Sequence, residues 1–220
     1  MKTRDKILLT SLMLFNEEGE PNVSTVDISN EMDISPGNLY YHFKGKKFII
    51  VELYKQFEQE LVEILQAPIN KEINMKDGWF YLYVVFEHLY KFRFFYNNLS
   101  DILQRHPDIR KSFKRLIKLK SNTSKTLLVF LIEQQILNIK QEEMPEVTEN
   151  IIIILTHWIN HASFRDIADK EVMIIHRGVF QIMSLIAPYF NDDYRYVYQQ
   201  ARHFYETLLA ESSSEAKSFR

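Results

Sequence analysis

A short stretch of the chain combines residue types that bind nucleic acids. Residues 35–47 read SPGNLYYHFKGKK, so a cap-forming start precedes aromatic hydroxyls, an imidazole and three lysines within four positions. An amide such as that of Asn38 can pair with a base edge, and tyrosine, histidine and lysine side chains donate to phosphate oxygens. The stretch fits a helix that lies against a polyanion. The alternative is an aromatic helix buried in a protein core.

The residues around this stretch predict a helix-turn-helix. Ser24 and Thr25 can cap a short helix over residues 26–32. Ser35 can cap a second helix, in which Pro36 takes the first position, where its missing N–H costs nothing. Two short helices joined by such a turn, within a set of three helices, are typical of this motif.

The second helix of the pair is expected to read the major groove, because its N-terminal residues meet base edges in this motif. Leu39 and Phe43, four residues apart, would hold the helix to the two helices before it. Lys46, at the start of the next helix, is expected to bind phosphate with full charge. We predict DNA contacts from Thr25, Ser35, Pro36, Gly37, Asn38, Tyr40, Tyr41, His42 and Lys46.

The same segment resembles the DNA-binding signature of TetR-type bacterial transcriptional regulators. The resemblance covers roughly residues 4–53: a capped short helix, a turn, a Gly-x-Leu-Tyr-x-His-Phe helix, then a lysine and an amphipathic helix. It departs at Met32 and Asp33, where the family usually has small residues. Residues 92–116 also resemble the body of one subgroup of this family. The matching positions of the signature are Thr25, Ile28, Ile34, Ser35, Gly37, Leu39, Tyr40, His42, Phe43, Lys46 and Ile49.

Composition places the chain among cytoplasmic helical proteins. It has 220 residues, 46% of them hydrophobic, with five glycines, six prolines and no cysteine, which disfavours all-β folds and excludes disulfides and thiolate metal sites. The N-terminal residues are amphipathic and lack a signal-peptide cleavage pattern. The longest uncharged run, residues 150–164, is too short and too polar to span a bilayer. We therefore expect no membrane partner.

The net charge of −2 does not by itself indicate DNA binding. Residues 1–50 carry six lysines and arginines against seven acidic residues, so this part is about −1. Any DNA binding must therefore depend on where the few cations lie.

Helical periodicity dominates the rest of the chain, and we predict an all-α fold. Expected helices are Arg4–Glu18, Val26–Met32, residues 36–44, Lys46–Leu65, Asp77–Tyr96, Leu99–Arg105, Pro107–Ile139, Pro145–Ile167, Glu171–Ala187 and Asp192–Leu209. The predicted domains are a DNA-binding unit (1–47), a connecting helix (48–66), a ligand-binding and dimerisation domain (67–211) and a flexible tail (212–220).

The segment from Trp79 to Tyr96 is apolar almost all round, so it is either a core helix or the wall of a cavity. The family resemblance implies an effector pocket at this helix and the long helices that follow. An apolar site with a few polar groups would suit a hydrophobic effector, such as a drug-like or acyl compound. We predict its lining as Trp79, Tyr83, Phe86, Glu87, Tyr90, Leu127, Phe130, Leu131, Trp158 and His161.

Residues 150–164 and 172–187 are richer in Ile, Met and Leu than one helix face needs, which indicates association. The resemblance implies a homodimer through two late helices, and two helix-turn-helix units reading a palindromic operator also require a dimer. The predicted interface residues are Ile154, Met173, Ile174, Phe180 and Met183.

Two further patterns have ordinary explanations. Residues 105–125 carry eight basic residues against Asp108, which is usually a solvated face. The sharper hypothesis is that this face lies toward DNA or pairs with Glu17 and Glu18. His157 and His161 share a helix face but lack a third metal ligand, so neither a metal nor another cofactor is expected.

No catalytic triad, glycine-rich phosphate loop or carboxylate pair is present in the sequence. We therefore predict a DNA-binding transcriptional regulator, a repressor that releases its operator when the effector binds. The alternatives are a small-molecule carrier or sensor with a vestigial DNA-binding domain, and, more remotely, an enzyme.

Overall fold

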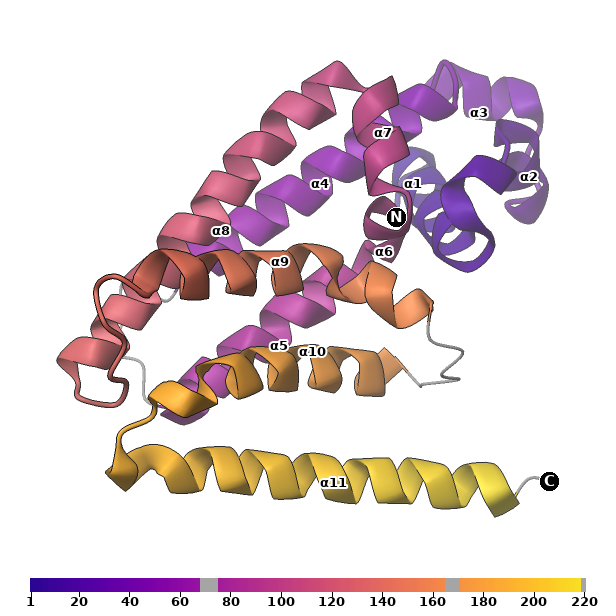
Figure 1. Ribbon diagram of the computed structural model, residues 1–220. Helices are drawn as coiled ribbons and strands as arrows, with labels where there is room; N and C mark the ends of the chain where they lie inside the picture. The colour runs from indigo at the N-terminus through magenta and orange to yellow at the C-terminus, as the bar shows by residue number, and fades with distance from the viewer. Residues whose placement is uncertain (68–74, 165–170, 219–220) are drawn as a thin grey trace. The chain divides into compact units, whose positions relative to one another are not determined.

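A computed structural model of the protein describes residues 1–67, 75–164 and 171–218. These residues are helical, and one isolated β-bridge joins Leu137 and Phe190 among them, so the all-α prediction is confirmed (Figure 1). The α-helices are α1 (Thr3–Leu14), α2 (Thr25–Glu31), α3 (Pro36–His42), α4 (Lys46–Gln66), α5 (Met75–Lys91), α6 (Arg93–Asn97), α7 (Leu99–Arg105), α8 (Pro107–Glu133), α9 (Met144–Ser163), α10 (Glu171–Ile186) and α11 (Arg195–Ser218).

The chain divides into two compact units. The first consists of Met1–Glu63 and Lys91–Leu116, and the second of Ile64–Tyr90 and Ile117–Arg220. Residues 91–116 therefore cluster with the N-terminal helices, although the sequence placed them in the ligand-binding domain. Helices α4 and α8 each begin in the first unit and end in the second.

Local capping fixes the ends of the short N-terminal helices. Ser24 caps α2 in a reciprocal box: its Oγ accepts from the Asp27 N–H, and the Asp27 carboxylate accepts from the Ser24 N–H at 2.8 Å. The Ser24 hydroxyl also donates to this carboxylate at 2.7 Å, and this bond, followed by that from the Ser24 N–H, holds the pKa of the Asp27 carboxyl below its ordinary value. Asp33, in the turn before α3, has a φ of 51°. Aspartate tolerates this left-handed conformation, which accounts for an acidic residue at a position where the family has small ones.

The aromatic helix predicted for residues 77–96 is broken at Phe92, and this part of the prediction is wrong. Asn16, in the π-helical turn after α1, donates from Nδ2 to the Lys91 carbonyl at 2.9 Å. Its Oδ1 accepts from the Phe94 N–H at 3.1 Å. The side chain thus satisfies backbone groups that an unbroken helix would have paired internally.

The residues after the break build the core of the first unit. The Phe57 ring of α4 lies 5.5 Å from Phe92 and 5.7 Å from Phe95, and the Tyr54 ring lies 5.5 Å from Phe95. These four side chains are buried. Aromatic pairs at this spacing add to the energy of burying their area.

Helices α9, α10 and α11 form a row in the second unit, each packed on the next (Figure 1). The Trp158 Nε1 donates to the Ile174 carbonyl at 2.8 Å across the α9–α10 contact. A Cβ at Gly178 would lie 2.6 Å from the Phe86 ring, so the glycine is what allows this close approach. Residues 171–189 are long and apolar enough to cross a membrane by length and composition alone, and 39% of that window is buried in the structure.

Two other helix ends differ from expectation. Helix α8 ends at Glu133 rather than at Ile139, because Gln135 adopts a φ of 57° and the Ile136 N–H turns back to the Leu131 carbonyl. Helix α11 ends at Ser218, so it includes most of the segment expected to be a flexible tail. The predicted end of α9 at Ile167 lies outside the described residues.

Candidate DNA-binding surface and ligand cavity

The start of α3 is fixed by its cap and open to solvent. Ser35 Oγ accepts from the Asn38 backbone N–H at 3.2 Å, and Pro36 takes the first helical position. Pro36, Gly37 and Asn38 are exposed. The Asn38 amide has no hydrogen-bond partner among the described residues, so both its donor and its acceptor are available to a base edge.

The two faces of α3 have different roles. Leu39 and Phe43 are 2% and 4% exposed, as their spacing predicts, and anchor the helix to its unit. Tyr40 and Tyr41 are 56% and 78% exposed, so neither is a core residue. His42 is half-buried, with its ring edge-on to Tyr41 at 5.2 Å. The outer face of α3 thus presents hydroxyl and imidazole groups on a buried apolar support.

Lys46 has a different position from the one expected. Its Nζ donates to the backbone carbonyls of Glu20 at 2.5 Å and Val23 at 2.8 Å, and lies 3.0 Å from the Glu20 carboxylate. These contacts use all three donors of the ammonium group. The side chain therefore ties the start of α4 to the segment before α2 instead of facing outward. Thr25, also predicted to contact DNA, is half-buried at the first position of α2, and Ser24 supplies the cap.

Glu20 is the centre of this internal network. Its side chain is fully buried, and its second carboxylate oxygen lies 2.5 Å from Nη2 of Arg105 in α7. Arg105 also pairs with Asp101 at 2.6 Å, and the hydrogen bonds to Asp101 and Glu20 raise the pKa of its guanidinium. Burial lowers the pKa of the neighbouring His106 imidazole, with a further contribution from the Arg105 charge. One buried carboxylate thus connects the helix-turn-helix to α4 and α7.

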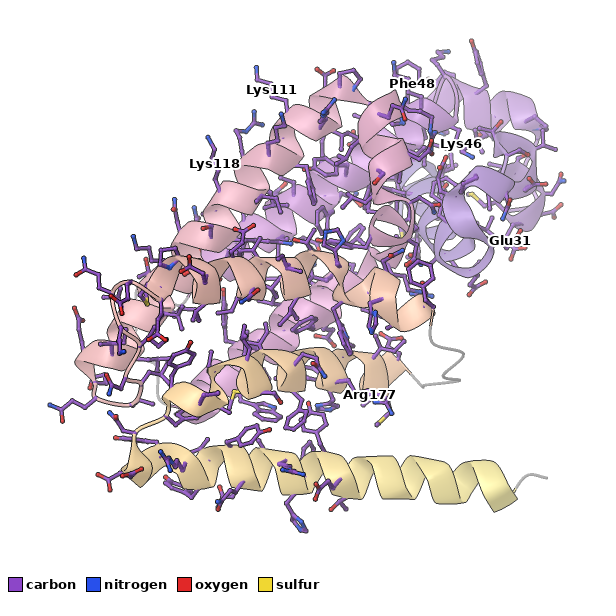
Figure 2. The ribbon with its side chains drawn as sticks, viewed as in Figure 1. Glu31, Lys46, Phe48, Lys111, Lys118 and Arg177 are labelled. Carbon is purple, nitrogen blue, oxygen red and sulfur yellow. The ribbon has the colours of Figure 1, made fainter. Side chains whose placement is uncertain are left out.

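Exposed cations flank the end of α3 and line one face of α8. Lys44 and Lys47 flank Gly45 and are exposed, and Lys44 Nζ lies 4.6 Å from the centre of the Tyr40 ring. On α8, the side chains of Lys111 and Lys118 point away from the helix into solvent (Figure 2). Among the described residues the exposed cations of this face make no ion pair, so the pairing with Glu17 or Glu18 is not observed: Arg110, Lys111, Lys114, Arg115 and Lys118.

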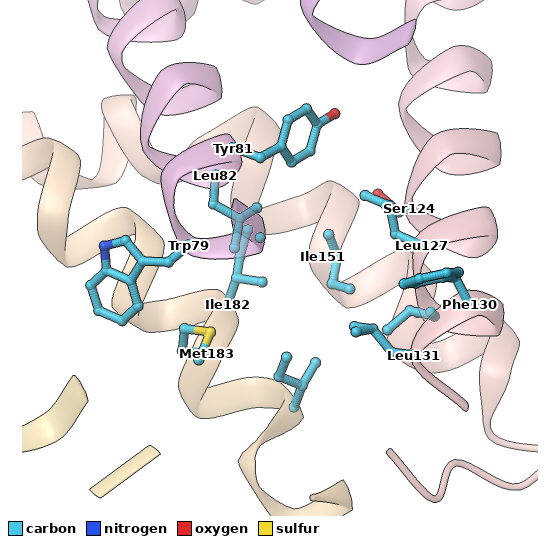
Figure 3. A pocket seen from close by; sticks show the side chains of 13 residues that line it. Trp79, Tyr81, Leu82, Ser124, Leu127, Phe130, Leu131, Ile151, Ile182 and Met183 are labelled. Atoms are coloured by element: carbon cyan, nitrogen blue, oxygen red, sulfur yellow. The ribbon is translucent and has the colours of Figure 1, made fainter. Parts of the chain in front are cut away.

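The second unit contains a cavity of about 100 Å³ between α5, α8, α9 and α10. Figure 3 shows side chains from these helices converging on it. The lining side chains are apolar except for the hydroxyls of Tyr81 and Ser124 and the indole N–H of Trp79, and none of them is charged. Its residues are Gly78, Trp79, Tyr81, Leu82, Ser124, Leu127, Leu128, Phe130, Leu131, Ile151, Ile182, Met183 and Ile186.

Two family models match this chain. Bacterial regulatory proteins of the tetR family match residues 7–53, and the bacterial transcriptional repressor TetR matches residues 56–198. The chain belongs to the TetR family of bacterial transcriptional regulators. The helix-turn-helix described above is the first matched region, so it is the DNA-binding part of this TetR-family chain.

Individual relatives support the assignment over most of the chain. A TetR-family transcriptional regulator from Marinobacter aquaeolei VT8 superposes with a TM-score of 0.85 and is 32% identical, covering 93% of this chain and 99% of its own. The Tn10 TetC protein of Escherichia coli is 26% identical over 80% of this chain and 89% of its own length. The biofilm operon negative transcriptional regulator IcaR of Staphylococcus aureus is 26% identical, over 73% of this chain and 84% of its own.

The cavity of this TetR-family chain contains four of the ten predicted lining residues: Trp79, Leu127, Phe130 and Leu131. The other six lie elsewhere. Phe86 and Trp158 pack against Gly178, the Tyr83 ring lies 5.0 Å from His176, Glu87 and His161 are exposed, and Tyr90 is half-buried away from the cavity.

Sequence reasoning missed nine lining residues, of which five come from α5 and α8 and four from α9 and α10, the helices that had been assigned to dimerisation. Met183 was predicted at the dimer interface but is 4% exposed and lines the cavity, and Met173 is 5% exposed within the subunit. Both side chains are buried within the single subunit, and their place in an interface stays a prediction. Ile154, Ile174 and Phe180 are half-buried, so their place in an interface stays a prediction. Among the described residues no three potential metal ligands come together, and His157 and His161 are both exposed.

Proposed function

We propose that this regulator is a homodimeric, cytoplasmic repressor that reads a two-fold symmetric operator through α3 and leaves it when a small apolar effector fills the cavity. The observation that carries the proposal is the two-sided α3. Leu39 and Phe43 bury one face, while the Asn38 amide on the other has no partner within the described part of the chain. A base edge in the major groove supplies the donor and acceptor that this amide lacks.

We assign phosphate binding to the polar and charged side chains around the end of α3 that are accessible to solvent. Tyr41 and His42 can donate to phosphate oxygens, and Lys44 and Lys47 supply charge from either side of Gly45. Lys46 acts as a positioning residue, because its ammonium group is already bonded to Glu20 and Val23. The start of α4 is therefore held in a fixed position relative to the segment that leads into the recognition helix.

A physical connection from the cavity to this point runs through α8 and α4. Ser124 lines the cavity, and the adjacent Thr123 donates from Oγ1 to the Leu65 carbonyl, near the end of α4, at 3.3 Å. The other end of α4 begins with Lys46. A ligand that shifts α8 would thus displace α4 and change the spacing of the two recognition helices in the dimer. Such an effector needs only to bind the DNA-incompetent state more tightly.

The relatives support the direction of regulation. IcaR is named a negative transcriptional regulator, and the second family model describes a bacterial transcriptional repressor. We extend repression to this chain on that basis.

Selection of bound sequences from random duplexes tests the proposal. We expect a palindrome whose half-sites lie about one helical turn, roughly 34–36 Å, apart. Asn38→Ala should then lose about 1–3 kcal/mol of specific binding, while Asn97→Ala, an exposed amide on α6, should not. Recovery of no preferred sequence would favour the carrier or sensor without operator binding.

A further inference from the structure

The polar groups of the cavity are two hydroxyls that lack partners. The Tyr81 hydroxyl is buried and has no hydrogen-bond partner among the described residues. The Ser124 hydroxyl likewise makes no hydrogen bond within the described part of the chain. Figure 3 shows Tyr81 from α5 and Ser124 from α8 on the same side of the cavity, above the apolar side chains of the lining. The buried hydroxyl without a partner thus lies on the same side as a second hydroxyl.

A buried hydroxyl without a hydrogen-bond partner destabilises the protein unless something in the site bonds to it. Burial raises the pKa of the Tyr81 hydroxyl, so it stays protonated and can both donate and accept at neutral pH. Ser124 has the same dual capacity. The end of the cavity therefore matches a ligand group that can exchange hydrogen bonds with two hydroxyls.

The rest of the wall excludes charge. The other lining side chains carry no charge and are apolar except for the indole N–H of Trp79. A carboxylate or ammonium placed here would lose its hydration without gaining an opposite charge, which is strongly unfavourable. Lys120 lies one helical turn before Ser124 on α8, but its fully buried amine is directed to the Leu155 carbonyl at 3.5 Å and does not line the cavity.

The volume sets the size of the ligand. At about 100 Å³ the cavity is well below the range of drug-sized sites, which begin at roughly 300 Å³. Apolar cavities of about 150 Å³ take up benzene. A single six-membered ring, with small adjustments of the flexible Met183 and Leu127 side chains, is the scale that fits. The drug-like or acyl effector expected from the sequence is too large for the cavity as it stands.

We propose that the effector is an uncharged molecule of about one ring in size, apolar over most of its surface, with a single hydroxyl-like end bound by Tyr81 and Ser124. This inference rests on the proposed function, because it takes the cavity to be the effector site. It adds the chemical class of the ligand and the two residues that select it.

Calorimetric titration of the full chain without DNA tests the proposal, with phenol as the probe and toluene and benzoate for comparison. Wild-type protein should bind phenol about tenfold more tightly than toluene, the value of one net hydrogen bond, and should not bind benzoate. Tyr81→Phe should reduce phenol to the affinity of toluene, and Ser124→Ala should weaken phenol by a smaller factor. Tyr83→Phe, outside the cavity, should change neither.

Thermal unfolding separates this result from a folding defect. Tyr81→Phe removes an unsatisfied hydroxyl and keeps the ring, so the ligand-free variant should be at least as stable as wild type. Equal affinity for phenol and toluene in wild type, preference for benzoate, binding of none of the probes, or an unchanged preference in Tyr81→Phe would each overturn the inference.

Operator selection, and release of the operator by phenol, are measured in separate experiments. If phenol binds with the expected selectivity but does not release the operator, the ligand class stands and the effector part of the proposed function fails. If none of the probes binds but a palindromic operator is selected, the ligand class fails and DNA reading stands.

Discussion

The outer face of α3 and the cavity of the second unit both depend on polar groups without partners, but in opposite surroundings. On α3, Asn38 and Tyr41 are exposed, so water meets their hydrogen bonds and the lack of a protein partner costs no stability. In the cavity, the Tyr81 hydroxyl is shut away from water and carries its cost in the ligand-free protein. Substitutions on the outer face of α3 should therefore leave the free energy of unfolding unchanged. Substitutions in the second unit that change side-chain volume or polarity should change it.

The largest expected effect concerns the buried Lys120 of the second unit. Burial lowers the pKa of its amine from 10.5 to about 7. Between these two pH values the unfolded chain binds a proton at Lys120 that the folded chain does not. The free energy of unfolding should therefore rise with pH by up to roughly 1.4 kcal/mol per pH unit in this range. Below pH 7 both states are protonated at Lys120, so this residue should add no pH dependence. Lys120→Met should remove this rise and stabilise the protein at neutral pH, as measured by urea unfolding from pH 6.5 to 10. Lys125→Met, at an exposed site on the same helix, is the control and should retain the wild-type slope.

Removal of Glu20 should be the most damaging change in the first unit. Glu20→Ala leaves Lys46 and Arg105 without their shared carboxylate, and we expect a loss of about 3 kcal/mol, the lower end for a broken buried pair because both cations are partly exposed. Asp101→Ala removes the exposed partner of the same arginine and should cost less than about 1 kcal/mol. Equal losses in chemical denaturation would contradict a central role for Glu20.

Alanine substitutions at two glycines, one in α10 and one in α3, allow a direct comparison of the two regions. Gly178→Ala places a Cβ 2.6 Å from the Phe86 ring and 2.8 Å from Trp158, and should cost about 1–3 kcal/mol through overpacking. Gly37→Ala meets nothing closer than 3.8 Å, so it should leave the melting temperature unchanged or raise it. Its cost should appear in DNA binding, where the added methyl group separates the start of α3 from the bases. If either variant lowered both the melting temperature and the affinity for DNA, the α3 surface and the packing around Gly178 would not be independent.

The smallest effect distinguishes two neighbouring lysines. Lys47→Ala removes an exposed charge and should reduce the salt dependence of operator binding by about 0.9 in the log–log slope, if it contacts one phosphate. Lys46→Ala should instead lower thermal stability and leave the slope nearly unchanged, because its ammonium group bonds internally. A reduced salt slope for Lys46→Ala, with no loss of thermal stability, would instead support the phosphate contact that the sequence predicts for Lys46.

The helix-turn-helix could be predicted because its determinants are local. Caps at Ser24 and Ser35, proline at the first position of α3, and anchors four residues apart fix each helix from within a few residues. The internal bonds of Lys46 could not be predicted, since they depend on Glu20, which is 26 residues away and buried by the fold. The break at Phe92 depends on Asn16, 78 residues before the amide that it binds.

The cavity was predicted only in part for the same reason. Leu127, Phe130 and Leu131 share a face of one helix, so helical spacing groups them correctly. Ile151 and Ile182 join them only because α9 and α10 pack closely at Gly178, and composition alone assigned these apolar helices to dimerisation. A glycine in the middle of an apolar helix was the one signal in the sequence for that close contact.

The central claim is that filling the cavity and binding the operator exclude one another, and a reciprocal titration tests it most directly. Phenol would be titrated into free protein and into operator-bound protein, and the operator into protein with and without saturating phenol. Phenol should bind the complex more weakly, by the same factor by which it weakens operator binding. Equal affinity of phenol for the free and operator-bound protein would contradict the account.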